Sequence, residues 1–134
     1  MFDWLRRNKS TPLTGAPAVR RQKTYSAQSG YVYQYVYEGQ RPAALEREKG
    51  AEFVFDVSAD RKTSFPVCVF MSHAVVAGWE TEHERPLTAT ERYAIAKLAM
   101  LQAFDERPDP ARMREAVRVR PADVQAILET LGIE

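Results

Sequence analysis

Two histidines and a run of acidic residues are the part of this chain whose residue types suit acid–base chemistry. Glu80, Glu82, His83 and Glu84 lie together, and His73 precedes His83 by ten residues. A histidine beside a carboxylate transfers protons near neutral pH when both side chains meet in one pocket. We therefore name His73, His83 and Glu82 as candidate catalytic residues, and an enzyme requires a pocket that joins one histidine to one of these carboxylates.

The other motifs that a small enzyme uses are missing from the sequence. Zinc sites favour His and Cys at short spacings, and the chain has neither an H-E-x-x-H nor a C-x-x-C pattern. The only cysteine, Cys68, lies between Val67 and Val69 in an apolar run, which indicates a buried structural thiol rather than a nucleophile. No glycine-rich phosphate loop is present. We therefore predict no metal, no cofactor and no catalytic motif.

Four tyrosines alternate along one segment and form the main candidate binding surface. They share one face of a predicted strand and are Tyr31, Tyr33, Tyr35 and Tyr37. A row of tyrosine rings suits recognition, because each ring contributes area and a polar tip at low entropic cost. In the alternative interpretation the tyrosines lie beneath the helices, with their hydroxyls at the rim. Both interpretations fit the pattern.

A basic segment just before the tyrosines raises single-stranded nucleic acid as an alternative partner. Arg20, Arg21 and Lys23 would contact phosphates while the tyrosines stack on bases. Residues 1–24 hold six Lys or Arg and one Asp, whereas residues 25–134 hold 13 Lys or Arg and 17 Asp or Glu. Because the second part is net negative and no cation interleaves the tyrosines, a protein partner is favoured over nucleic acid.

The first residues combine apolar and basic side chains. Phe2, Trp4 and Leu5 stand beside Arg6 and Arg7, which suits a hook that docks into a groove, or weak contact with a membrane surface. Seven residues are too few for strong membrane binding alone, since isolated helices below about 12 residues are marginal. We therefore favour the hook, with Trp4 as its binding residue, and interpret residues 1–30 as a basic arm and linker.

The remaining pattern predicts a single α+β domain over residues 31–134. Alternation predicts strands over 31–37 and 53–58, and a run that is apolar on both faces predicts a covered strand over 65–71. The run from Pro42 to Gly50 predicts a short helix. A capping-box pattern at residues 88–91 opens a helix that ends before Pro108, and helices follow over about 110–117 and 121–131. The expected fold is a small antiparallel sheet of about three strands, in the order β-α-β-β, followed by three helices packed on one face.

The long helix leads to the functional prediction. Apolar residues cover nearly its whole circumference, so it is buried on several sides, either inside the domain or against a second copy of the chain. The composition is that of an ordinary globular domain, and no apolar run approaches the ~20 residues of a membrane span. We therefore expect a cytoplasmic domain that acts by protein–protein contact, as a homo-oligomer, through the tyrosine face, this helix and the arm.

Overall fold

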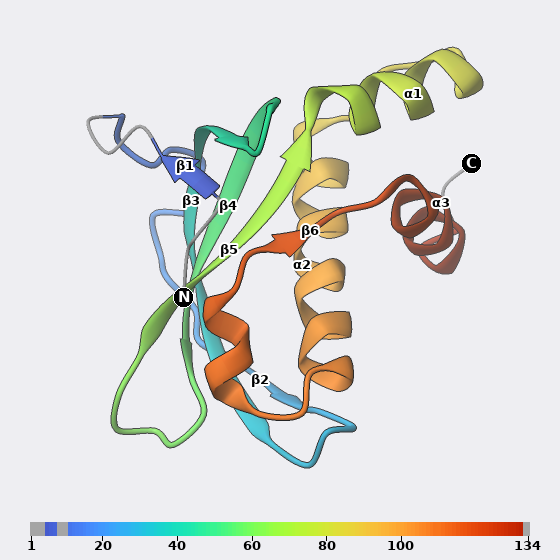
Figure 1. Cartoon of the computed structure of the whole chain (residues 1–134). Coiled ribbons are helices and arrows are strands. Elements are labelled where there is room, and N and C mark those ends of the chain that lie inside the picture. Colours follow the sequence, from blue (N-terminus) through green and yellow to red (C-terminus); the bar gives the residue numbers. More distant parts are fainter. Residues whose placement is uncertain (1–4, 8–10, 133–134) are drawn as a thin grey trace.

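The computed structural model describes residues 5–7 and 11–132, which form one curled sheet and the helices packed against it (Figure 1). The strands are β1 (Leu5–Arg7), β2 (Lys23–Ser26), β3 (Val32–Leu45), β4 (Glu48–Ser58), β5 (Phe65–Ser72) and β6 (Val117–Arg118). The helices are α1 (His73–His83), α2 (Ala89–Glu106), the 3-10 helix η1 (Pro110–Arg114) and α3 (Pro121–Thr130). None of the helices in these described ranges is long and apolar enough to cross a membrane.

The sheet has six strands and is mixed, so the predicted antiparallel sheet of about three strands is wrong. The strand order is β1-β3-β4-β5-β6, and β2 pairs with the end of β3 opposite to β1. Neighbouring strands are antiparallel except β5 and β6, which run parallel. The three strands that the sequence pattern missed have only two to four residues each. Segments this short carry too little alternation to be recognised.

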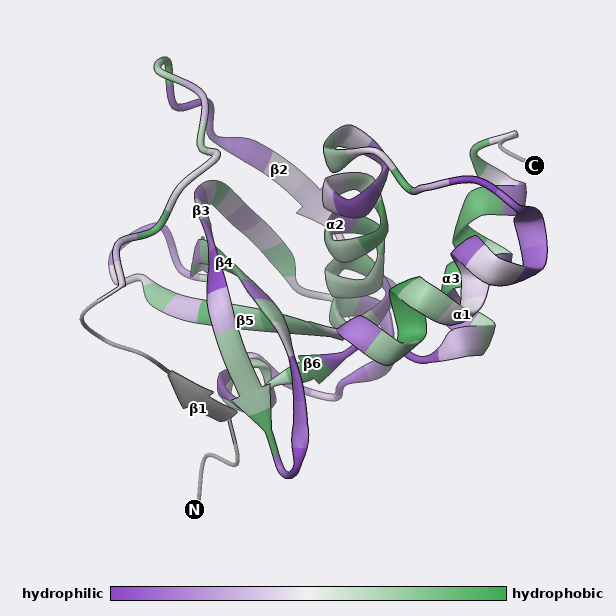
Figure 2. Ribbon diagram, turned by 90° about the horizontal axis from the view of Figure 1, so that it is seen from above, coloured by the Kyte–Doolittle hydropathy of each residue, from purple (hydrophilic) through white to green (hydrophobic). Residues whose placement is uncertain are grey.

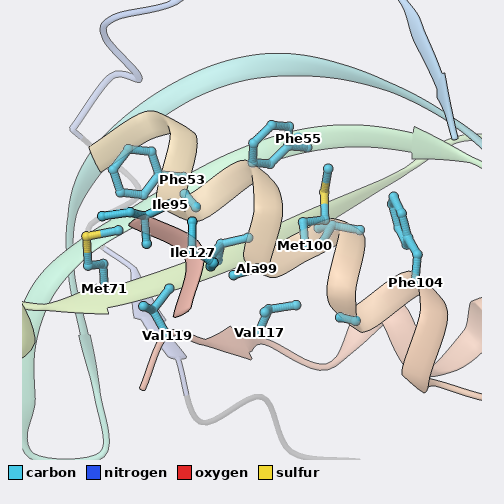
Figure 3. Close-up of a cluster of buried hydrophobic side chains, with 14 of the residues drawn as sticks. Phe53, Phe55, Met71, Ile95, Ala99, Met100, Phe104, Val117, Val119 and Ile127 are labelled. Atoms are coloured by element: carbon cyan, nitrogen blue, oxygen red, sulfur yellow. The ribbon is translucent and has the colours of Figure 1, made fainter. Parts of the chain in front are cut away.

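The inner face of the sheet, defined as the face that packs on α2, holds the main core. Buried residues of this face include Tyr33, Tyr35, Phe53, Phe55, Val69 and Met71. Figure 3 shows Phe53, Phe55 and Met71 gathered around Ile95, Met100 and Phe104 of α2. The ring of Phe104 stacks on Tyr33, with ring centroids 3.9 Å apart and ring planes inclined by 7°. The face that carries the tyrosines is therefore the core face of the sheet.

The boundaries and the burial predicted for the long helix α2 are confirmed. Its capping box is formed: the Glu91 N–H donates to Thr88 Oγ1 at 3.1 Å, and the Thr88 N–H donates to Glu91 Oε1 at 2.9 Å. α2 packs against β6 at the end of the sheet and against α3, and Val117, Val119 and Ile127 fill these contacts (Figure 3). Leu98 and Leu101 are partly buried against the same core, so α2 has apolar partners within the chain on more than one side.

The segment over residues 42–50 is a β-hairpin, and the helix predicted there is wrong. β3 and β4 stay paired as far as Leu45, and the turn follows at Glu46 and Arg47. Glu46 has a φ of 57°, the left-handed conformation that tight hairpin turns use. Strand pairing overrides the local helix propensity here. The pairing buries Leu45 in a small cluster on the outer face of the sheet. Cys68 lies buried in the same cluster, as predicted for a structural thiol.

Helix α1, which begins at His73 and ends at His83, was not predicted from the sequence. The helix begins after Ser72, whose hydroxyl accepts a hydrogen bond from the Val75 N–H at 3.1 Å. Trp79 is the buried residue of α1. Figure 2 shows α1 and α3 side by side at one flank of the molecule. The helix predicted over 121–131 is confirmed as α3, whereas the one predicted over 110–117 ends early, at η1, and continues as β6.

Gly50 of β4 lies against the backbone of β5, and its replacement tests this packing. A Cβ added at Gly50 would lie 2.2 Å from the Met71 carbonyl oxygen, a backbone atom that cannot turn aside. Gly50→Ala is therefore expected to lower the free energy of unfolding, measured by urea denaturation, by about 2–3 kcal/mol. Gly78→Ala in α1 is the matched control, since nothing lies within 4 Å of the added Cβ. It should raise stability by up to about 1 kcal/mol. A Gly50→Ala protein as stable as the parent would contradict this geometry.

Candidate binding site

Three parts of the chain enclose a cavity of about 420 Å³. One wall comes from residues 15–23 of the basic segment, the floor comes from β3, and the other wall comes from the first turns of α2. The cavity is lined by Arg20, Arg21, Lys23, Tyr35, Tyr37, Gln40, Thr90 and Tyr93, among others. Its volume lies in the usual range of small-molecule sites, about 300–1,000 Å³.

The basic segment is held in place by backbone pairing along the free edge of β3. Thr14 and Gln40 exchange two backbone hydrogen bonds, of 2.9 Å and 2.8 Å, and further along Lys23 pairs with Tyr35 at the start of β2. The residue before Gln40 must be glycine: Gly39 has a φ of 124°, and a Cβ there would lie 2.8 Å from the Thr14 carbonyl oxygen. The cavity wall thus depends on the close approach that Gly39 permits.

Three tyrosines form the aromatic side of the cavity. The rings of Tyr37 and Tyr93 lie 4.7 Å apart, with planes inclined by 57°. Burial, together with the neighbouring Tyr93, raises the pKa of Tyr37 to about 12. Burial raises the pKa values of Tyr35 and Tyr93 as well. All three hydroxyls therefore keep their protons at neutral pH and offer a donor and an acceptor beside a broad apolar surface.

The rim of the cavity is positively charged. Arg20, Arg21 and Lys23 are exposed, and Arg20 forms an ion pair with Glu38. Within the described part of the chain, no ion pair engages Arg21 or Lys23. The first turn of α2 adds the positive end of the helix dipole at the same place.

The acidic residue of this first turn is already engaged elsewhere. Arg85 donates to both carboxylate oxygens of Glu91, at 3.0 Å and 2.9 Å. The hydrogen bonds from Arg85 have the largest effect on the pKa of Glu91, and the one from the Thr88 N–H has the next largest. Together they lower this pKa to about 2. The carboxylate is therefore ionised at neutral pH and its charge is balanced by Arg85. The rim as a whole favours an anion.

The structure separates the four tyrosines that the sequence placed on one face. Tyr33 is buried against Phe104, and Tyr35 and Tyr37 line the cavity. Tyr31, just before β3, is 39% exposed. The four rings therefore form no continuous exposed patch, because α2 covers the middle of the row. Trp4 lies outside the described residues.

The candidate catalytic residues are also separated. His73 lines a cavity of about 290 Å³ together with Glu80 and Arg92, so the structure joins one histidine to one of the named carboxylates. Glu80 accepts a hydrogen bond from the Leu87 N–H at 2.7 Å, which fixes the turn between α1 and α2.

His83 and Glu82 do not line that cavity. His83 stacks on Trp79, with ring centroids 4.2 Å apart, and its Nδ1 lies 3.0 Å from the Trp79 carbonyl oxygen, whereas Glu82 is exposed. Across residues 5–7 and 11–132, no three His, Cys, Asp or Glu side chains are grouped as metal ligands would be.

Tyr93, Thr90 and Gln40 are site residues that the sequence did not reveal. The capping box located the start of α2 and so marked Thr90 as part of its first turn. Nothing in the pattern, however, indicated that this turn faces the basic segment across β3. Comparisons of the chain with protein-family models, curated proteins and solved structures give no match.

A tyrosinate titration tests the buried aromatic side of the cavity. Because the pKa of Tyr37 is higher in the folded state, about 12, than the ordinary value of 10.0, the folded state holds this proton more tightly. The resulting contribution to stability is complete below pH 10 and is lost as the pH rises toward 12. Tyr37→Phe is therefore expected to remove the last-titrating tyrosine from the absorbance titration and to flatten the loss of stability in that window. Tyr31→Phe is the exposed control. Unchanged absorbance near pH 12 in Tyr37→Phe would show that another residue titrates there.

Proposed function

We propose that the domain binds a small anionic molecule that carries a flat aromatic or apolar ring, in the cavity between the basic segment, β3 and α2. One observation carries this proposal: Tyr35, Tyr37 and Tyr93 line the same cavity whose rim holds Arg20, Arg21 and Lys23. A binding pocket of this kind combines an apolar wall with a few convergent polar groups.

Each half of the ligand has a matching part of the cavity. The tyrosine side suits a ring, because aromatic pairs contribute about 0.5–1.5 kcal/mol beyond the area that they bury. The rim suits an anion, because Arg21 and Lys23 are free of ion pairs within the described residues and the helix dipole adds its positive end. Glu38 balances only Arg20.

The proposed role is binding without chemistry, in the cytoplasm. Cytoplasmic location is part of the proposal because the one cysteine of the sequence is a buried thiol, as is usual where disulfides do not form. The protein–protein role and the homo-oligomer remain predictions from the sequence. The two surfaces that suggested them, the tyrosine face and α2, pack mainly on each other.

A nucleic-acid strand would find fewer stacking rings than the sequence suggested. Tyr33 is 0% exposed beneath α2, so the row is interrupted and a run of bases has no continuous row of tyrosines to stack on. One ring with one anionic group suits the observed cavity better than a strand does.

Two probes with the same ring system test the proposal. Anilinonaphthalene sulfonate carries an anion, whereas phenylnaphthylamine has the same rings without the sulfonate. Fluorescence titration should show one site that binds the sulfonate at least about tenfold more tightly than the neutral probe, a difference of about 1.4 kcal/mol. Arg21→Gln with Lys23→Gln should remove that difference and leave binding of the neutral probe unchanged. Tyr93→Leu should weaken the binding of both probes.

The control is the double variant Arg47→Gln with Lys49→Gln, which removes the same charge from the exposed β3–β4 hairpin, outside the cavity lining. It should leave both affinities unchanged. If this control weakens binding of the sulfonate probe as much as Arg21→Gln with Lys23→Gln does, binding of that probe depends on net charge alone and the proposal fails. Equal binding of the two probes to the parent protein would also overturn it.

A further inference from the structure

A third cavity, of about 560 Å³, lies over the strand ends of β2, β3 and β4 and the turn that follows β4. It is on the outer face of the sheet, because Gln34, which lines it, alternates along β3 with the inward-pointing Tyr33 and Tyr35. All nine residues that line this cavity are polar or charged. Its lining is thus unlike that of the cavity of the proposed function, which is lined by Tyr35, Tyr37 and Tyr93 and is called the tyrosine cavity below. Binding at the outer-face cavity does not depend on the proposed function.

Gln34 is the unusual residue of this cavity. Its side chain is 5% exposed, and both the amide nitrogen and the amide oxygen are buried without a hydrogen-bond partner. A buried polar group left unpaired costs about 1–3 kcal/mol, so an amide with both atoms unpaired is expensive to keep. Such a group calls for a specific explanation, and a ligand that approaches from the neighbouring cavity supplies one.

The strand register surrounds Gln34 with hydroxyl groups. Thr24 of β2 and Ser58 of β4 are its direct partners on either side, so the three side chains form one row across the sheet. Asp56 lies two residues from Ser58 on the same face and adds a carboxylate to the cavity lining. The row therefore offers donors and acceptors side by side.

Two cations stand at the edge of the same cavity on a preformed turn. Asp60 Oδ1 accepts hydrogen bonds from the N–H groups of Lys62 and Thr63, both at 2.8 Å. These bonds, led by the Thr63 N–H, lower the pKa of Asp60 to about 2, so the turn keeps its carboxylate at neutral pH. Arg61 and Lys62, carried by this turn, line the cavity and are exposed.

We propose that this outer-face cavity binds a polyhydroxylated anion of the sugar-phosphate class. Hydroxyl groups both donate and accept, so a vicinal pair matches the unpaired nitrogen and oxygen of Gln34. Asp56 accepts from further hydroxyls, and Arg61 and Lys62 bind the phosphate. A wall without apolar side chains favours a ligand without an apolar part, unlike the ligand of the tyrosine cavity.

Isothermal titration calorimetry with glucose 6-phosphate tests this inference, with glucose and inorganic phosphate as the separate halves. Glucose 6-phosphate should bind one site at least about tenfold more tightly than either half. If inorganic phosphate binds as tightly as the sugar phosphate, the exposed cations alone hold it and the inference is wrong. Absence of binding by glucose 6-phosphate at millimolar concentration also overturns it.

Gln34→Leu separates the role of the amide from the stability of the fold. This variant should lose at least about tenfold in affinity for glucose 6-phosphate, while its melting temperature stays equal or rises because the unpaired polar atoms are gone. Thr24→Val, which removes one hydroxyl at nearly constant shape, should also lower the affinity for glucose 6-phosphate. This variant replaces Gln34→Leu in the test if Gln34→Leu does not fold.

Two controls distinguish this site from the tyrosine cavity. Gln102→Leu changes an exposed glutamine on α2, outside the cavity lining, and should leave the affinity unchanged. Arg21→Gln with Lys23→Gln should also leave it unchanged, so failure of the proposed function at the tyrosine cavity has no effect on this test. Full retention of affinity by both Gln34→Leu and Thr24→Val would overturn the inference.

Discussion

The burial of α2 is the constraint on which the rest of the structure depends. Its buried residues cover about half of its circumference and are Ile95, Ala96, Ala99, Met100, Ala103 and Phe104. A helix with this distribution needs apolar partners on more than one side. The curled sheet, including β6, supplies one partner, and α3 supplies the other (Figure 1). The three alanines leave room for close approach, whereas Phe104 fixes the sheet by stacking on Tyr33.

The long free edge of β3 sets a second requirement, and the basic segment meets it. β3 has 14 residues, and an unpaired edge of that length would expose a row of backbone donors and acceptors. β1, Thr14 and β2 pair with this edge at three places along its length. The same pairing carries Arg20, Arg21 and Lys23 to the start of α2. Edge protection and the wall of the tyrosine cavity are therefore one structural feature, and both require glycine at position 39.

Local pattern predicted the parts of the fold that a single segment determines. The strands near 31–37 and 53–58 follow from alternation, and the strand near 65–71 follows from its apolar run. The helices α2 and α3 follow from helical periodicity and end signals, which each segment carries by itself. The helix predicted over 42–50 failed because pairing with β4 overrides local propensity. At the site, the sequence marked Tyr35, Tyr37 and the three cations by type. It did not mark Tyr93, whose place in the cavity depends on how α2 crosses the sheet.

Two neighbouring residues show why an unpaired buried group on the outer face differs from one in the core. The Tyr33 hydroxyl is also buried without a hydrogen bond. Its ring, however, packs on Phe104 in the core, and burying 150–250 Å² of aromatic surface at about 25 cal/mol per Å² contributes about 4–6 kcal/mol. This exceeds the cost of about 1–3 kcal/mol for the hydroxyl, so packing alone explains Tyr33. Gln34 leaves two polar atoms unpaired and has only two methylene groups, worth about 0.8 kcal/mol each, to offset them. Packing does not explain Gln34, and the polar cavity beside it does.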